Sequence, residues 1–113
     1  MASYVIRNTE SEYVVKIINE NSFTITLANT AKGGVTPDGL TIRRYYVTMN
    51  AGNDYLEISR NSTPVLELHG NEVVDLSALG MAIDEESNQT VSIAPSNSGH
   101  KYTLIIALGK IIN

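Results

Sequence analysis

Few side chains in this chain could serve acid–base, nucleophilic or metal chemistry. The 113 residues contain no Cys, and His69 and His100 are the two side chains that titrate near neutral pH. The two histidines lie far apart in the sequence, each next to a glycine of a predicted turn. Because a metal site usually needs three or four ligands and a general base needs a positioned partner, we expect both histidines to be ordinary residues of surface turns.

One short acidic cluster, Asp84, Glu85 and Glu86, offers oxygen ligands for a cation. Calcium loops alternate their ligands and include a glycine at a sharp turn, and this stretch has neither feature. A solvated loop explains the cluster better. The sequence therefore predicts no catalytic residue, no metal site and no cofactor site, and we expect that the protein is not an enzyme.

The run Arg43, Arg44, Tyr45 and Tyr46 is the one cluster that combines basic and aromatic side chains. On a strand, such residues can stack nucleic-acid bases and contact phosphates. The chain, however, has 8 basic against 12 acidic residues and a net charge of −4, so neither nucleic acid nor an anionic membrane is an expected partner. Since Tyr and Arg also anchor protein interfaces, we predict that this cluster contacts another protein.

The elements that must position these residues are predicted to be β-strands. Val, Ile, Thr, Tyr and Phe make up 38 of the 113 residues, which favours pleated, half-buried surfaces. Residues 22–28 alternate apolar and polar side chains and form the clearest strand, and residues 12–19 are expected to pair with them as a hairpin. The other predicted strands are residues 40–50, 55–60, 65–69, 72–76, 90–94 and 101–112.

The spacing of these strands predicts the fold class. About eight short strands separated by Gly, Pro and Asn are typical of an all-β protein, an antiparallel β-sandwich or jelly-roll-like barrel. The length fits a single domain over residues 1–113. Residues 31–39 are predicted to be a contact loop, and residues 77–83 a loop or single turn. The last strand is apolar on both faces, so we expect it at the centre of a sheet or beneath a neighbouring subunit.

Residues 1–7 are a candidate N-terminal arm. Tyr4 and Ile6 share one side of an extended segment there, which could add a strand to the sheet of a neighbouring molecule. The segment lacks the apolar core of a signal peptide, and no apolar run reaches the ~20 residues of a membrane helix. We therefore expect a protein made in a cytoplasm. A domain of this size buries only about two thirds of the surface that its unfolded chain exposes, so contacts with identical subunits would add stability. Identical subunits are therefore expected partners.

Several short runs carry a resemblance to a known class of proteins. They are RRYY (43–46), LEISRN (56–61), VLELHG (65–70), VDL (74–76), GMAI (80–83) and, after Gly99, YTLIIAL (102–108). In their order these runs resemble small virion structural proteins of marine tailed bacteriophages, over about residues 40–110. The resemblance implies an all-β protein added to the outside of a capsid, or to a neck or tail component, with no catalytic residues to carry over.

The residues and the resemblance together predict a non-enzymatic bacteriophage virion structural protein. We expect a capsid decoration or cement protein, made in the host cytoplasm, that binds the shell as a homo-oligomer through the major capsid protein or other virion proteins. The candidate assembly contacts are Tyr4, Ile6, Arg43, Arg44, Tyr45 and Tyr46. The alternatives are a neck or tail component and a carbohydrate- or receptor-binding domain of a tail fibre, in which Tyr45, Tyr46 or Tyr55 would stack on sugar rings.

Overall fold

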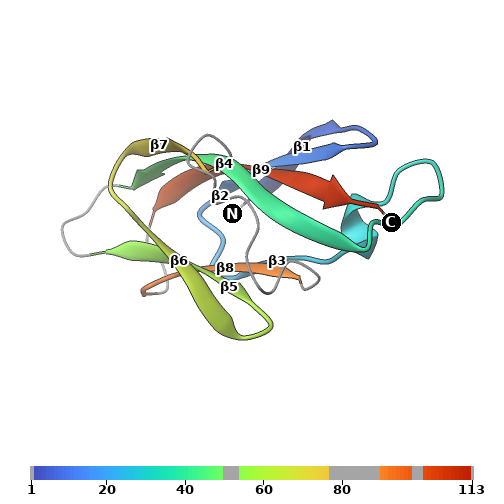
Figure 1. The fold of residues 1–113 in the computed structure, drawn as a ribbon. Coiled ribbons are helices and arrows are strands. Elements are labelled where there is room, and N and C mark those ends of the chain that lie inside the picture. The colour runs from blue at the N-terminus through green and yellow to red at the C-terminus, as the bar shows by residue number, and fades with distance from the viewer. Residues whose placement is uncertain (1, 50–53, 77–89, 98–100, 113) are drawn as a thin grey trace.

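The computed structural model describes residues 2–49, 54–76, 90–97 and 101–112, which form two antiparallel sheets packed face to face (Figure 1). Sheet A has five strands in the order β1-β2-β9-β4-β7, and sheet B has four in the order β3-β8-β5-β6. The strands are β1 (Ala2–Asn8), β2 (Glu12–Ile18), β3 (Phe23–Ile25), β4 (Gly39–Met49), β5 (Tyr55–Arg60), β6 (Thr63–His69), β7 (Glu72–Asp75), β8 (Val91–Pro95) and β9 (Tyr102–Ile111), with a 3-10 turn η1 (Ala28–Thr30) after β3. The predicted all-β sandwich is confirmed.

The core lies between the two sheets and is filled by alternate residues of their strands. From sheet A these include Val15, Ile17, Leu104 and Ile106, all at most 1% exposed. From sheet B they include Leu56, Ile58, Leu68 and Val91, all 0% exposed. The period of two that marks these strands in the sequence is therefore the period of burial, which is why the fold class was predictable.

Strand β9 confirms the prediction of a central strand. It pairs with β2 on one side and with β4 on the other, and ten residues of β4 have a partner on it. Its inward side chains are fully buried, and its outward Ala107 is 3% exposed. On the side of the sheet turned away from the core, Thr103 and Ile105 of β9 are only half-buried, so this face of the central strand is apolar but partly open.

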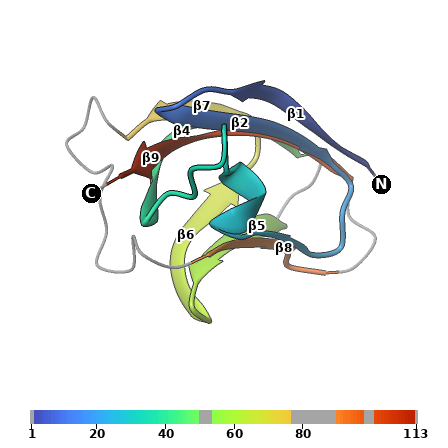
Figure 2. The same ribbon diagram turned by 90° about the vertical axis from the view of Figure 1, so that its right-hand side faces the viewer.

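The predicted hairpin between residues 12–19 and 22–28 is wrong. Strand β2 pairs with β1 and β9, whereas β3 pairs with β8 in the opposite sheet. Asn19 explains the crossing, because its φ of 56° turns the chain and its Oδ1 accepts the N–H of Tyr102 at 2.7 Å. The short break thus leads from one sheet to the other (Figure 2).

The strand predicted over residues 22–28 ends early, at Ile25. Local side-chain hydrogen bonds replace the ladder beyond it. Asn29 Oδ1 accepts the N–H of Thr26 at 2.9 Å, and Thr30 Oγ1 donates to the carbonyl of Leu27 at 2.8 Å. Such bonds compete with strand pairing and favour a turn, here the 3-10 turn η1.

A β-bulge in β4 explains why neither face of this strand looks apolar in the sequence. Ile42 pairs with Leu108 and Arg44 with Ala107, so Arg43 is the extra residue. The bulge shifts the alternation by one. As a result Ile42 before it and Tyr45 after it both face the core.

The remaining strands lie where they are predicted, with small differences at their ends. The β5–β6 hairpin turns on Asn61 and Ser62, whose φ angles are 50° and 64°. The predicted arm is residues 1–7; its described residues lie in the edge strand β1 (Ala2–Asn8) of the chain's own sheet. The predicted loop 77–83, the acidic cluster 84–86 and His100 lie outside the described residues.

Candidate interaction surfaces

Glu12 is the centre of an arginine cluster on the outer face of sheet A, the face turned away from sheet B. The Glu12 side chain is 8% exposed. Arg44 binds it through two pairs, Nη1 to Oε2 at 3.0 Å and Nη2 to Oε1 at 3.2 Å. Arg43 Nη1 lies 3.5 Å from Oε2, and Arg7 Nη1 lies 3.8 Å from Oε1. The cluster therefore joins strands β1, β2 and β4 through one carboxylate.

Gly109 makes room for this cluster, because β9 separates Glu12 from the arginines of β4. In the sheet register Gly109 faces Glu12 on one side and Thr41 on the other. A Cβ at position 109 would overlap Arg43 Nε and would lie 2.6 Å from Thr41 Oγ1. The Arg43 side chain thus crosses the sheet directly above Gly109.

A shallow hollow of about 280 Å³ lies beside the arginine cluster on the same face. Its lining residues are Val14, Arg44, Tyr45, Tyr46, Val73, Val74, Asp75, Ile105 and Ala107. Tyr46 is 41% exposed and Val73 is 74% exposed. The outer face of sheet A therefore combines guanidinium groups with accessible apolar side chains, the composition typical of protein interfaces.

Strand β1 forms one edge of sheet A and is exposed along its centre. Tyr4, Val5 and Ile6 are 57%, 56% and 55% exposed. The register with β2 shifts between Val5 and Arg7, so Ile6 lies in a bulge. An edge strand presents backbone N–H and C=O groups to a further strand, and three adjacent apolar side chains at such an edge favour pairing.

The structure separates the six predicted assembly contacts. Tyr4 and Ile6 lie on β1, and Arg43, Arg44 and Tyr46 lie on the outer face across two intervening strands. Tyr45 is not a surface residue: it is 7% exposed, faces the core, and its hydroxyl lies 3.5 Å from Glu72 Oε1. Burial, together with the Glu72 carboxylate, raises the pKa of Tyr45. Tyr45 is buried because the bulge at Arg43 turns its side chain toward the core.

Two residues of the arginine cluster were missed by sequence reasoning. Glu12 and Arg7 lie 32 or more residues from Arg44 in the chain. They approach it only because β2 and β4 both pair with β9, which places the two strands in one sheet. The one feature of the sequence that could have indicated Glu12 is its place as an acidic residue at the start of an apolar strand. Such a residue is equally typical of a solvent-exposed strand end.

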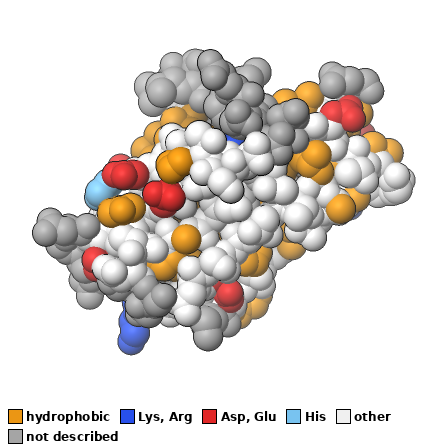
Figure 3. Space-filling view, turned by 90° about the horizontal axis from the view of Figure 1, so that it is seen from below, with side chains coloured by type: hydrophobic (Ala, Val, Ile, Leu, Met, Phe, Trp, Pro, Cys, Tyr) orange, Lys and Arg blue, Asp and Glu red, His pale blue; other side chains and the backbone are white. Residues whose placement is uncertain are grey.

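The outer face of sheet B carries a few acidic side chains among mostly uncharged and apolar ones (Figure 3). Glu57 and Glu67 stand directly opposite each other on β5 and β6. Ser59 Oγ donates to Glu57 Oε1 at 3.3 Å, and His69 Nε2 lies 3.3 Å from Glu67 Oε2. The His69 ring also lies 5.5 Å from that of Tyr55. His69 is half exposed, as predicted, although it ends a strand rather than lying within a turn.

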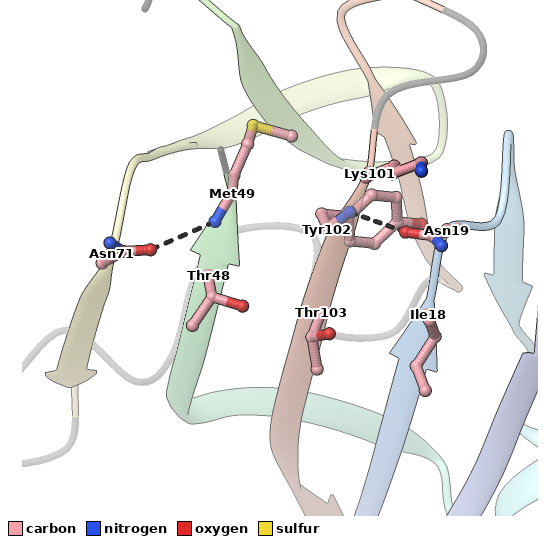
Figure 4. Close-up of a pocket in the computed structure, with 8 residues that line it drawn as sticks. All are labelled: Ile18, Asn19, Thr48, Met49, Asn71, Lys101, Tyr102 and Thr103. Atoms are coloured by element: carbon pink, nitrogen blue, oxygen red, sulfur yellow. Dashed lines mark hydrogen bonds between the residues drawn. The ribbon is translucent and has the colours of Figure 1, made fainter. Parts of the chain in front are cut away.

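A pocket of about 440 Å³ opens between the ends of β2, β4 and β9 (Figure 4). Two asparagine side chains bind backbone groups at its wall: Asn19 Oδ1 accepts the N–H of Tyr102, and Asn71 Oδ1 accepts that of Met49 at 3.3 Å. The Tyr102 hydroxyl donates to the Glu20 carbonyl at 2.7 Å, and burial raises the Tyr102 pKa to about 12. These side chains satisfy backbone groups at the ends of the strands, so the polar residues in the pocket wall have a role in holding the fold.

Among the residues that the structure describes, no three His, Cys, Asp or Glu side chains come together as a metal-binding group. Within the same residues no helix has the length and apolar character needed to span a bilayer.

Comparison with known proteins identifies no family for this chain. No family model matches it, and neither does any curated protein. Among solved structures, it is similar to a crystal structure of a putative mannose-6-phosphate isomerase from Ralstonia eutropha JMP134, with 11% sequence identity and a TM-score of 0.39. The match covers 97% of this chain and 83% of that one. A likeness at this TM-score supports no conclusion about fold or function.

Proposed function

We propose that this chain is a non-enzymatic structural protein that binds other protein subunits through the edge of β1 and the outer face of sheet A. In its specific form the proposal is a bacteriophage capsid decoration or cement protein that binds the shell surface as an oligomer. Such a protein would bridge neighbouring shell subunits and add many weak contacts that resist internal pressure. The β1 edge, with Tyr4, Val5 and Ile6 each more than half exposed, carries the proposal.

The physical argument rests on what a strand edge can bind. A further strand added to β1 would satisfy its outward backbone groups and cover its apolar side chains. Each 100 Å² of apolar surface covered in this way stabilises a complex by about 2.5 kcal/mol before the costs of association. The edge is therefore suited to a contact with another chain.

The phage-specific part of the proposal is supported by the resemblance of the strand and turn sequences. Its described runs lie on β4, β5, β6, β7 and β9, and thus on both sheets of the sandwich. The first of them, RRYY, contributes Arg43 and Arg44 to the arginine cluster and Tyr46 to the neighbouring hollow.

Co-sedimentation with empty phage shells tests the proposal. The wild-type chain should pellet with the shells, and the variant Tyr4→Lys/Ile6→Lys should lose at least about tenfold in affinity because two charges would enter the contact. The matched control Val35→Lys/Ile112→Lys changes two exposed apolar residues outside both surfaces by the same charge, and it should bind like wild type. Equal binding of both double variants contradicts the role of β1.

A second candidate function is carbohydrate or receptor binding in a tail fibre. The Tyr55 and His69 rings beside Glu67 on sheet B favour it, because aromatic rings offer apolar faces to a ligand and a carboxylate can accept hydrogen bonds from its hydroxyl groups. A glycan array distinguishes the two functions: binding that Tyr55→Ala abolishes supports the second. The copy number in purified particles separates shell from neck or tail, since hundreds of copies indicate the shell and a few indicate a neck or tail component.

A further inference from the structure

The charged side chains of the two outer faces are segregated by sign. Among the described residues, the outer face of sheet A carries four basic and two acidic side chains: Arg7, Lys16, Arg43 and Arg44 against Glu12 and Asp75. The strands of sheet B carry one basic residue, Arg60, and its side chain is fully buried. In a chain of net charge −4, sheet A thus presents a basic face and sheet B an acidic one.

The arginine cluster has more hydrogen-bond donors than its central carboxylate can accept. A guanidinium carries five N–H groups, whereas a carboxylate offers about four acceptor sites. The side chains of Arg7, Arg43 and Arg44 are 61%, 37% and 48% exposed, so their remaining donors reach the surface. Asp75, the other described carboxylate of this face, stands opposite Arg44 in the sheet register. Further carboxylates from a second copy would accept the remaining hydrogen bonds and reduce the repulsion among the three cations.

The outer face of sheet B has an excess of negative charge and of hydrogen-bond acceptors. Glu57 and Glu67 are directly opposed on neighbouring strands, an arrangement in which like charges destabilise a sheet. Glu67 is 57% exposed. A guanidinium between the two carboxylates would replace this repulsion with charge-assisted hydrogen bonds.

We propose that the basic outer face of sheet A in one copy binds the acidic outer face of sheet B in the next copy. The carboxylates of Glu57 and Glu67 would meet the arginine cluster. The Tyr55 ring would lie toward the apolar hollow that contains Tyr46. Because the two faces differ, the contact is head-to-tail and produces a ring or a filament. This contact specifies the self-association of the proposed assembly protein and in that respect rests on the proposed function.

Sedimentation velocity of the purified chain is the first test. At about 0.01 M salt, where charges act over about 30 Å, the wild-type protein should sediment as a species at least twice the 12.3 kDa chain mass. At about 1 M salt, where the Debye length is about 3 Å, it should return toward 12.3 kDa. A 12.3 kDa species at low salt, or an oligomer whose mass does not depend on salt, contradicts the inference.

Charge reversal is the second test. Glu57→Lys/Glu67→Lys makes the sheet B face basic, and Arg7→Glu/Lys16→Glu makes the sheet A face acidic while leaving the two closest arginines on Glu12. Each variant should be monomeric alone, and an equimolar mixture should associate again because complementary faces are restored. Failure of the mixture to associate contradicts the inference.

The controls separate this contact from other causes. Glu10→Lys/Glu20→Lys makes the same change in charge away from both faces and should associate like wild type. If a reversed variant melts well below wild type, Glu57→Gln/Glu67→Gln or Arg7→Gln/Lys16→Gln takes its place and should weaken association at least about fivefold. A wild-type chain that stays monomeric but binds a polyglutamate peptide would assign the cluster to another acidic partner, against this inference.

These measurements use no shells, so their outcome is independent of the proposed function. If the chain binds shells but does not self-associate, only the head-to-tail contact is contradicted. If the chain self-associates but does not bind shells, only the decoration role is contradicted.

Discussion

Gly109 on β9 and Arg43 on β4 are in direct contact across the outer face of sheet A, where a Cβ at position 109 would occupy the place of Arg43 Nε. The contact lets an arginine from one strand reach Glu12 two strands away. The absence of a side chain at Gly109 therefore leaves the space in which Arg43 crosses β9 toward Glu12.

Replacing this glycine should destabilise the protein. We expect Gly109→Ala to lower the free energy of unfolding by about 2 kcal/mol, because Arg43 and Thr41 must both move. Urea denaturation measures the change. In the double variant Gly109→Ala/Arg43→Ala the loss should be smaller than the sum of the two single losses. A Gly109→Ala protein as stable as wild type would show that Arg43 does not lie over β9.

Removing the Glu12 carboxylate should destabilise the protein, because the guanidinium groups around it would then repel each other. Glu12→Gln keeps the shape of the side chain, yet it leaves three guanidiniums without the anion they share. We expect a loss of about 2 kcal/mol, reduced from the value for a fully buried pair because the arginines are partly exposed. A double-mutant cycle with Arg44→Met should give a coupling energy of about 1 kcal/mol. Additive losses would exclude the ion pair as the cause.

The pH dependence of stability should show the burial of Tyr102. Its folded pKa of about 12 lies above the usual value near 10, so its neutral form is favoured in the folded state. This stability is fully present below about pH 10 and is lost as the pH rises toward 12, because the unfolded chain ionises first. The loss should be about 2 kcal/mol across that window.

The control for this prediction is Tyr102→Phe, which keeps the ring and removes the ionisable hydroxyl. Its unfolding free energy should fall less between pH 9 and pH 12 than that of wild type. Some slope will remain, since burial also raises the pKa of Tyr13 and of Tyr45. Identical slopes in the two proteins would show that Tyr102 is not buried as the structure has it.

The β5–β6 turn offers a stabilising substitution. Ser62 has a φ of 64°, a conformation that glycine adopts without strain, and Asn61 before it has a φ of 50°. Ser62→Gly makes the Asn-Gly pair that two-residue hairpins prefer. It should raise the free energy of unfolding by about 0.5–1 kcal/mol, which is measurable as a higher Tm. A lower Tm would contradict the turn geometry.

The sequence predicted the strands better than it predicted their partners. Alternation is a property of each segment by itself, so β2, β5 and β9 could be located from their own residues. Pairing depends on residues elsewhere. Nothing in residues 19–22 distinguishes a hairpin turn from a crossing to the opposite sheet, because the decisive bond comes from Asn19 to Tyr102, 83 residues away.

The candidate surfaces show the same limit. The exposure of Tyr4 and Ile6 does not follow from alternation, because Val5 between them is equally exposed on the edge strand β1. The burial of Tyr45 depends on a bulge one residue long, and a shift of one residue exchanges the two faces of a strand. The arginine cluster required three strands to be placed in order, which local patterns do not give.

Hydrogen–deuterium exchange of the chain, free and bound to shells, tests the central claim most directly. In the free protein the backbone of β1 should exchange faster than that of the central strand β9, because one side of β1 faces solvent. Shell binding should slow exchange in residues 2–8 and leave the Asn61–Ser62 turn unchanged. Protection that appears only outside sheet A, with residues 2–8 exchanging as in the free chain, would contradict the account.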